Sequence, residues 1–389
     1  MQNSGCEDEA DLRASIRELL ARPFARDEMA WVWAEADEEC PHPARIYQEL
    51  GANGWLAPHW PRRYGGLGLS EYASAVVAEE LTLHGIPDSV RVNTVDNAGS
   101  ILMRVGTEEQ RARYLPGIAR GTTVFSVLYT EPEVGSDLGA MSTRIEPVPG
   151  GWSLNGTKVW NARTAEAQFG TVAARIADEG RGTKFAEVGL FIVPLQAPGV
   201  RIEKIDSINH EDLFRVRLEE VFLPQEALVG SPGQGWALLT EALGLERTGV
   251  NFAGKARRWF DQLVAGLQAR GQLEEAGPRH GLHRLDAEIQ AARLLSWRAV
   301  RDVAKERQNP ASAAGAKWWA SSLAQQVALL AWQLLGPAFG RPHEDPHFPD
   351  LVQAAREAPG LTLAAGTSEM LLATVATDLM DGSDPWEDD

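Results

Sequence analysis

The chain has 389 residues, of which 44% are hydrophobic and 23% are charged, a balance typical of a globular protein with two or three domains. Its formal net charge of −17 disfavours nucleic acids and anionic membranes as partners. The two cysteines, Cys6 and Cys40, provide no disulfide framework, so we expect a cytoplasmic location.

The first block, residues 1–122, is predicted to be helical. It opens with acidic residues and lacks the basic start of a signal peptide. Ser70 is placed to begin a helix that stops at Gly85, since Ser favours helix starts and Gly favours helix ends. The run TEEQ, Thr107 to Gln110, has the pattern of a capping box at the start of another helix.

The second block, residues 123–230, has the pattern of short strands. Asn155-Gly156 stands between two alternating segments and predicts a hairpin turn. An apolar strand begins at Val188 and stops at Pro194, and an alternating strand from Arg215 ends at Pro224. Several short strands separated by turn signals indicate a small barrel or sandwich.

The third block, residues 231–389, returns to helical periodicity. Long segments from Asp286 and over Leu323 to Leu335 repeat apolar residues at three-to-four spacing, which predicts an antiparallel bundle. The apolar run Val327 to Gly340 is shorter than the ~20 residues of a membrane span, so we expect a buried helix. Two histidine pairs lack the further ligands of a recognised site, so no metal is predicted.

Seven motifs in chain order resemble the acyl-CoA dehydrogenase superfamily. They include the segment LGANGWLAPHWPRRYGGLGLSEY, the flavin-binding pattern YTEPEVGSDLGAMSTR and the strand NGTKVW. AEELTLHG, GTEEQRARYLPGIARG, GQGWALLTEALGLER and the closing AAGTSEM keep the same order. The resemblance implies an α+β, mostly α fold, with an N-terminal helical domain, a central β-barrel and a C-terminal four-helix bundle, in a dimer or homotetramer.

The resemblance also implies the chemistry. Family members bind FAD and oxidise the Cα–Cβ bond of an acyl thioester, carried on CoA or a carrier protein, and usually pass electrons to an electron-transfer flavoprotein. In many members the base stands just before the terminal GTS, where this chain has Ala365. Isovaleryl- and long-chain-type enzymes carry it on an earlier helix, at the position of Glu246. We therefore expect Glu246 to be the catalytic base, with an ion-paired surface residue beside Arg247 as the alternative.

The remaining site residues are carried over from matching motif positions. The resemblance places Ser136 and Arg247 near the substrate, and Trp160 against the flavin, with a core tryptophan as the alternative. The positions matched to cofactor contacts are Thr130, Gly135, Ser136, Trp160, Gln333, Gly366, Thr367 and Glu369. Gln333 matches a residue that reaches the cofactor of the partner subunit, and Gly366-Thr367 fits a helix N-cap as well as a phosphate site.

Two departures from the family pattern point to a specialised pathway. Ala162 replaces a Ser or Thr that hydrogen-bonds the flavin, a loss of roughly 1 kcal/mol. The family's R-x-x-F-G segment is replaced between Ala269 and Gly281, where Arg270 could substitute. Two alternatives therefore stay open beside the dehydrogenase: a flavin-dependent monooxygenase of the same fold, and a non-redox partner subunit that has lost FAD.

Overall fold

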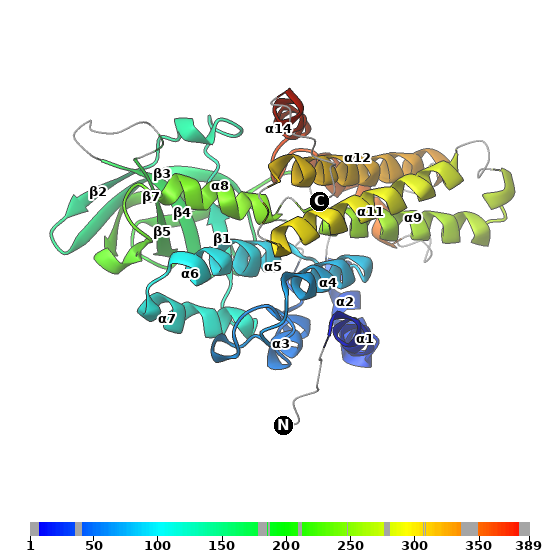
Figure 1. Cartoon of the computed structure of the whole chain (residues 1–389), viewed down its shortest axis with the longest axis horizontal. Coiled ribbons are helices and arrows are strands. Elements are labelled where there is room, and N and C mark those ends of the chain that lie inside the picture. Colours follow the sequence, from blue (N-terminus) through cyan, green and yellow to red (C-terminus); the bar gives the residue numbers. More distant parts are fainter. Residues whose placement is uncertain are drawn as a thin grey trace.

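The computed structural model describes residues 8–35, 41–177, 185, 187–208, 212–246, 248–275, 281–305, 307, 309–335 and 349–380. The side chains of residues 33–35, 241–246, 335 and 349–350 lie outside that description. Figure 1 shows three regions, in which a central sheet lies beside N-terminal helices and a bundle of long C-terminal helices. Of the described helices, none is both long and apolar enough to cross a bilayer.

The N-terminal region is helical, as predicted. Its elements are α1 (Glu9–Leu20), α2 (Pro23–Glu35), α3 (Ala44–Ala52), η1 (Arg62–Tyr64), α4 (Glu71–Leu83), α5 (Ser89–Arg91), η2 (Val92–Gly99), α6 (Ser100–Val105) and α7 (Glu108–Ala119). The element η2 is a π-helix, a rare geometry that often marks a functional site.

The predicted helix ends are confirmed, with one difference in mechanism. Thr107 and Gln110 form both hydrogen bonds of the capping box. Gly85 has a φ of +71° directly after the C-cap of α4, which a glycine adopts at no cost. Ser70 is the N-cap of α4 but makes no capping bond, because its hydroxyl donates to Glu9 Oε1 at 2.6 Å instead.

The central region is one eight-stranded sheet with the order β6-β7-β3-β2-β4-β5-β8, and β1 pairs with β4. Its strands are β1 (Phe125–Leu128), β2 (Arg144–Val148), β3 (Gly151–Ala162), β4 (Phe169–Ile176), β5 (Val188–Pro194), β6 (Val200–Ile205), β7 (Leu213–Pro224) and β8 (Leu228–Val229), with short turns η3 (Leu138–Ala140) and η4 (Gln225–Ala227). The predicted strands ending at Pro194 and Pro224 are confirmed.

The predicted hairpin turn at Asn155-Gly156 is wrong. Both residues lie within β3, and the turn from β2 comes earlier, at Pro149-Gly150. Gly156 sits at a register shift between β3 and β7, where a Cβ would approach Thr143 Oγ1 to 2.4 Å. The glycine is therefore needed for a β-bulge rather than for a turn, and Asn155 Oδ1 accepts a bond from Glu220 N at 2.8 Å.

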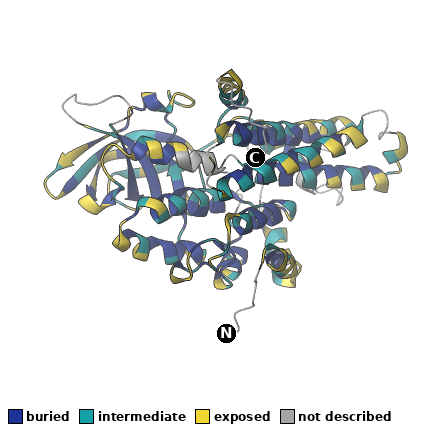
Figure 2. Cartoon of the chain, in the orientation of Figure 1, coloured by how far each residue is buried: buried dark blue, intermediate teal, exposed yellow. Residues whose placement is uncertain are grey.

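The C-terminal region contains α8 (Gly235–Glu246), α9 (Val250–Ala269), α11 (Leu282–Ala304), α12 (Pro310–Leu335), α13 (Pro349–Leu361) and α14 (Ser368–Met380). Helices α9, α11, α12 and α13 share one apolar core. The expected buried helix over Val327 to Gly340 is only half correct in the described part: Val327, Ala328 and Ala331 are buried, while Leu329 and Trp332 are exposed (Figure 2).

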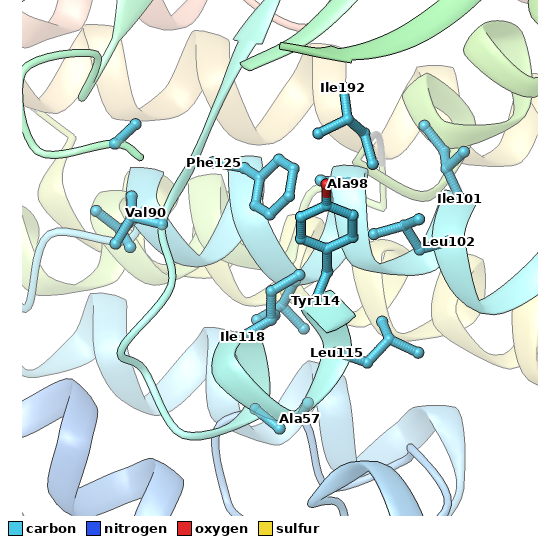
Figure 3. Close-up of a cluster of buried hydrophobic side chains, with 14 of the residues drawn as sticks. Ala57, Val90, Ala98, Ile101, Leu102, Tyr114, Leu115, Ile118, Phe125 and Ile192 are labelled. Carbon is cyan, nitrogen blue, oxygen red and sulfur yellow. The ribbon is translucent and has the colours of Figure 1, made fainter. Parts of the chain in front are cut away.

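A second core joins the N-terminal helices to the sheet. Tyr114 of α7 packs edge-on against Phe125 of β1 and Phe169 of β4, at centroid distances of 5.7 and 5.1 Å, an arrangement that aromatic rings favour. Figure 3 shows these helices and the sheet contributing side chains to the same cluster, including Ile118 and Ile192. This packing fixes η2 against β1, which matters for the site.

Candidate functional site

The predicted flavin-binding loop after β1 is held by a buried ion pair. Glu131 accepts hydrogen bonds from Ser142 N and Oγ, both at 2.6 Å, and from Thr143 N at 2.9 Å. Lys158 of β3 donates to Glu131 Oε1 at 2.9 Å and to Tyr129 O at 3.0 Å. Glu131 is 3% exposed and Lys158 is fully buried.

The charge state of this pair follows from its contacts. Burial alone would raise the pKa of Glu131, but Lys158 and the Ser142 and Thr143 donors outweigh it and lower that pKa to about 2. Glu131 is therefore a carboxylate at neutral pH. The pair joins the loop that carries Thr130 to the strand that carries Trp160, and both of its members went unassigned in the sequence because a motif does not reveal burial.

Trp160 stands at the irregular end of β3. It has a φ of +61° and is 54% exposed, so the core alternative for this tryptophan is excluded. Val159 N donates to Thr130 O at 3.0 Å, which brings Thr130 and Trp160 together. Left-handed backbone in a non-glycine residue is costly and persists where the surroundings enforce it, so the backbone at Trp160 is held in place while its ring is exposed.

The residues after Trp160 anchor the strand to the helices. Ala162 O accepts bonds from Asn93 Nδ2 of η2 at 3.3 Å and from Ser126 Oγ at 3.2 Å. Arg163, also left-handed at a φ of +59°, is buried and donates from Nε to Ser89 Oγ at 3.0 Å. The departure from the family at Ala162 therefore lies beside a set of contacts that fix the π-helix to this end of β3.

Gly135 and Ser136 lie in the exposed turn after Glu131. The closing segment is organised around Lys317 of α12, which is fully buried. Its Nζ donates to Leu361 O at 3.0 Å and to Gly366 O at 2.9 Å. Thr367 lies just before α14, and its Oγ1 accepts a hydrogen bond from Met370 N at 3.3 Å. Thr367 is therefore a helix N-cap, which is one of the two roles predicted for Gly366-Thr367.

Two further predicted residues, Gln333 and Glu369, are exposed on α12 and α14. Gln333 follows Lys317 by 16 positions, about 24 Å along a helix, so one chain does not bring Gln333 to the Gly366 segment that Lys317 holds.

Glu246 is the last residue of α8, but its side chain and all of Arg247 lie outside the described residues. The segment that follows is firmly placed. Gly249 has a φ of +83° and a Cβ there would meet Ser296 Oγ at 2.9 Å. Asn251 Nδ2 donates to Asp88 Oδ2 at 3.1 Å. The end of α8 therefore leads directly into a tight, buried connection to α9. Arg270, which could substitute for the missing R-x-x-F-G segment, is the C-cap of α9, and its role towards a cofactor stays a prediction.

Comparison with known proteins covers the whole arrangement. Three family profiles match in order: acyl-CoA dehydrogenase N-terminal domain over 7–122, middle domain over 126–221 and C-terminal domain over 233–380. The chain belongs to the acyl-CoA dehydrogenase family. Members of this family are FAD-dependent oxidoreductases that act on CH–CH groups, and the chain is an enzyme of that class.

Similar proteins agree with this assignment. Acyl-CoA dehydrogenase FadE26 of Mycobacterium tuberculosis is 27% identical over 356 residues, covering 87% of each chain. The human mitochondrial short-chain specific acyl-CoA dehydrogenase is 29% identical and covers 81% of this chain and 78% of its own. Among solved structures, the Tcur3481-Tcur3483 steroid ACAD superposes with a TM-score of 0.84 at 28% identity, covering 99% of this chain and 100% of that one. The predicted fold class is thereby confirmed.

Proposed function

We propose that this acyl-CoA dehydrogenase removes two hydrogens across the Cα–Cβ bond of an acyl thioester, with Glu246 as the base. The observation that supports this most is Trp160, an exposed aromatic ring held in a left-handed backbone beside Thr130. Soluble chains gain little from presenting a constrained tryptophan to water, so such a ring favours a ligand that covers it.

The residues around Trp160 fit a flavin. Thr130, Gly135, Ser136 and Trp160 would hold the flavin itself, and Gly366, Thr367 and Glu369 would hold the adenosine and pyrophosphate part. Gly366 at a φ of +96° and the N-cap Thr367 lie at the start of α14, and helix N-termini favour phosphate. When bound, FAD accepts the hydride that leaves Cβ, since no protein side chain can accept one.

The protein's own part is acid–base chemistry. In the proposed reaction the Glu246 carboxylate removes the α-proton, a step that a positioned base accelerates typically 10²–10⁴-fold. Ala365, with a methyl side chain, leaves the alternative base position empty. Hydrogen-bond donors near the thioester oxygen would stabilise the negative charge of the developing enolate. We place Ser136 and Arg247 on the substrate side of the site.

A second copy of the chain is part of the proposal. Among its described residues, helix α14 buries one side chain, Leu371, and exposes the apolar side chains of Met370, Leu372, Leu379 and Met380. Trp332, next to Gln333 on α12, is 59% exposed. Large exposed apolar surfaces mark interfaces. In an oligomer, Gln333 would reach the FAD bound to the partner subunit rather than the FAD of its own chain. We propose a homodimer or homotetramer.

The electron acceptor, the specialised pathway and the cytoplasmic location stay predictions. An electron-transfer flavoprotein is the acceptor we expect from the family. Acyl-CoA and acyl-carrier substrates are both compatible with the proposal.

The test is anaerobic bleaching of the bound flavin. The purified protein should show flavin absorbance, and a panel of acyl-CoA and acyl-carrier thioesters should bleach it. Glu246→Gln should bind FAD and lose bleaching, while Glu18→Gln, on the exposed face of α1 with a side chain 79% accessible, should behave as the native protein. A chain that takes up no FAD would instead favour the non-redox subunit, and oxygen consumption coupled to reduced flavin would favour the monooxygenase.

A further inference from the structure

A cavity of about 80 Å³ lies where α4, η2, α9 and α11 meet, and its wall is partly apolar and partly charged. Its volume is several times what one ordered water needs, enough for a small chemical group. The polar residues that line it and carry the argument are Glu71, Asp88, Arg91, Asp96, Thr248 and Asn251. A cavity with this many charged groups in its wall is unusual for the tail of a fatty acid, which would leave them without partners.

The wall of the cavity is connected along the chain to both halves of the proposed reaction centre. Thr248 and Asn251 follow Glu246 by two and five residues. Val92 also lines the cavity, and its neighbour Asn93 donates to the carbonyl of Ala162, two residues after Trp160. If the reacting carbons lie between Glu246 and Trp160, the part of the acyl chain beyond Cβ has this cavity beside it.

The wall holds more negative than positive charge. Arg91 is the cation in the wall, and it donates to Asp96 Oδ2 at 2.7 Å and to Ser74 Oγ at 2.6 Å. Asp88 is held by Asn251 and by Lys255 at 3.1 Å, but Lys255 also pairs with Glu357 at 2.6 Å. Among the described residues, carboxylates therefore outnumber cations by two, with or without the Lys255–Glu357 pair.

The other groups around the cavity do not offset this excess. Burial, with a further effect of Arg91, lowers the pKa of His59 to about 3, so this imidazole is neutral. Helix α11 contributes only Val300 and Val303. Burial raises the pKa of Asp96 even though Arg91 opposes the shift, which is the behaviour of an acid with too few cationic partners.

Two buried groups lack partners within the described part of the chain. Arg91 is 2% exposed and its Nε makes no hydrogen bond, and Nδ1 of His59 makes none either. The hydrogen bond recorded for Asp96 uses a single carboxylate oxygen, and the Glu71 side chain, 47% exposed, stands 4.0 Å from His59. Buried polar groups are nearly always satisfied. The Arg91 Nε–H needs an acceptor, which water can supply, while the carboxylate oxygens of Asp96 and Glu71 leave room for a donor in the occupant.

We propose that the acyl group of the substrate is short and carries a protonated amine, which this cavity receives between Asp96 and Glu71. The inference rests on the proposed dehydrogenation and adds to it the substrate class. The ammonium supplies the cation that the wall lacks, donates to the open oxygen of Asp96 and is attracted by the charge of Glu71. A saturated hydrocarbon tail of the same shape offers these two carboxylates neither a donor nor a positive charge.

The test compares two isosteric substrates on the native holoenzyme. The probes are 4-(dimethylamino)butanoyl-CoA, protonated at neutral pH, and 5-methylhexanoyl-CoA, its neutral hydrocarbon counterpart. We expect the rate constant of anaerobic flavin bleaching divided by the dissociation constant to favour the amine at least about tenfold, the scale on which a pocket separates such pairs. Equal or better bleaching by the hydrocarbon overturns the inference and leaves the dehydrogenase proposal standing. Bleaching by neither probe, nor by any thioester of the wider panel, overturns both.

Two variants locate the preference. Glu71→Gln, at the half-exposed rim, should reduce the preference for the amine by weakening binding and bleaching of the amine probe. Asp96→Asn should reduce it further, since the amide keeps the shape of the side chain but not its charge. The Glu18→Gln control should keep the full preference. A preference that survives both substitutions would place the amine elsewhere and contradict the proposal, whether or not Asp96→Asn is also less stable.

Discussion

Replacing Glu131 by glutamine should destabilise the protein more than any surface substitution. The carboxylate accepts three bonds from the Ser142-Thr143 segment and one from Lys158. An amide presents an NH₂ group to some of these donors and leaves the Lys158 ammonium with Tyr129 O as its recorded acceptor. Breaking a buried pair in this way costs about 3–5 kcal/mol, because the remaining charge is uncompensated.

The assay is urea unfolding monitored by tryptophan fluorescence. The dependence of the free energy of unfolding on urea concentration should be the same for all variants. The matched control is Glu203→Gln, which removes an exposed pair with Arg217 at 3.2 Å and should cost no more than about 1 kcal/mol. A double variant, Glu131→Leu with Lys158→Met, should recover part of the loss, since apolar replacements remove both buried charges. If Glu131→Gln lowers the free energy of unfolding no more than Glu203→Gln does, the Glu131–Lys158 pair does not hold the loop in place.

The same residue sets an acid limit. Its folded pKa of about 2 lies below the ordinary value of 4.5, so Glu131 contributes stability above about pH 4.5 that is lost as the pH falls towards 2. The free energy of unfolding of the native protein should therefore fall between about pH 4.5 and pH 2. That of Glu131→Gln should fall less over the same range. Unfolding at several pH values in the same assay measures the difference.

Three further substitutions test other parts of the structure. Gly249→Ala forces a Cβ to within 2.9 Å of Ser296 Oγ at a φ of +83°. We expect the free energy of unfolding to fall by about 1–3 kcal/mol, measured by thermal unfolding, and flavin bleaching to be slower in stopped flow. Unchanged values would mean that the connection after Glu246 is loosely packed. Lys317→Met removes the hydrogen bonds from Nζ to Leu361 O and Gly366 O, so FAD affinity, measured by calorimetric titration, should fall more than the rate of bleaching per bound flavin. Unchanged FAD affinity would show that Lys317 does not support the site. Thr107→Ala breaks the capping box and should cost about 1 kcal/mol in urea without affecting FAD binding; a lower FAD affinity would show that α7 supports the site.

The local signals in the sequence predicted most of the elements. Thr107 with Gln110, and Gly85, mark helix ends because capping needs only neighbouring residues, and the prolines at 194 and 224 end strands for the same local reason. Asn155-Gly156 failed because the same dipeptide serves a turn or a bulge, and the choice depends on β7 and Thr143, which are distant in sequence.

The site was harder to predict, because its geometry depends on burial. The motif positions of Thr130 and Trp160 were found, and the structure brings them together through Val159. The buried pair of Glu131 with Lys158 and the charged wall around Asp96 were missed, since charged residues in a sequence are exposed by default. One signal in the sequence could have indicated the pair. Glu131 lies in the TEP motif and Lys158 in the NGTK motif, and both motifs were assigned to the same site.

The most direct test of Glu246 as the base is the exchange of the substrate's α-hydrogen with solvent. An acyl-CoA that enolises but lacks a removable β-hydrogen is incubated with the protein in D₂O, and deuterium at Cα is followed by mass spectrometry. The native protein and Glu18→Gln should exchange it, and Glu246→Gln should bind FAD equally well but exchange at least about a hundredfold more slowly. Exchange at the native rate in Glu246→Gln would contradict the account.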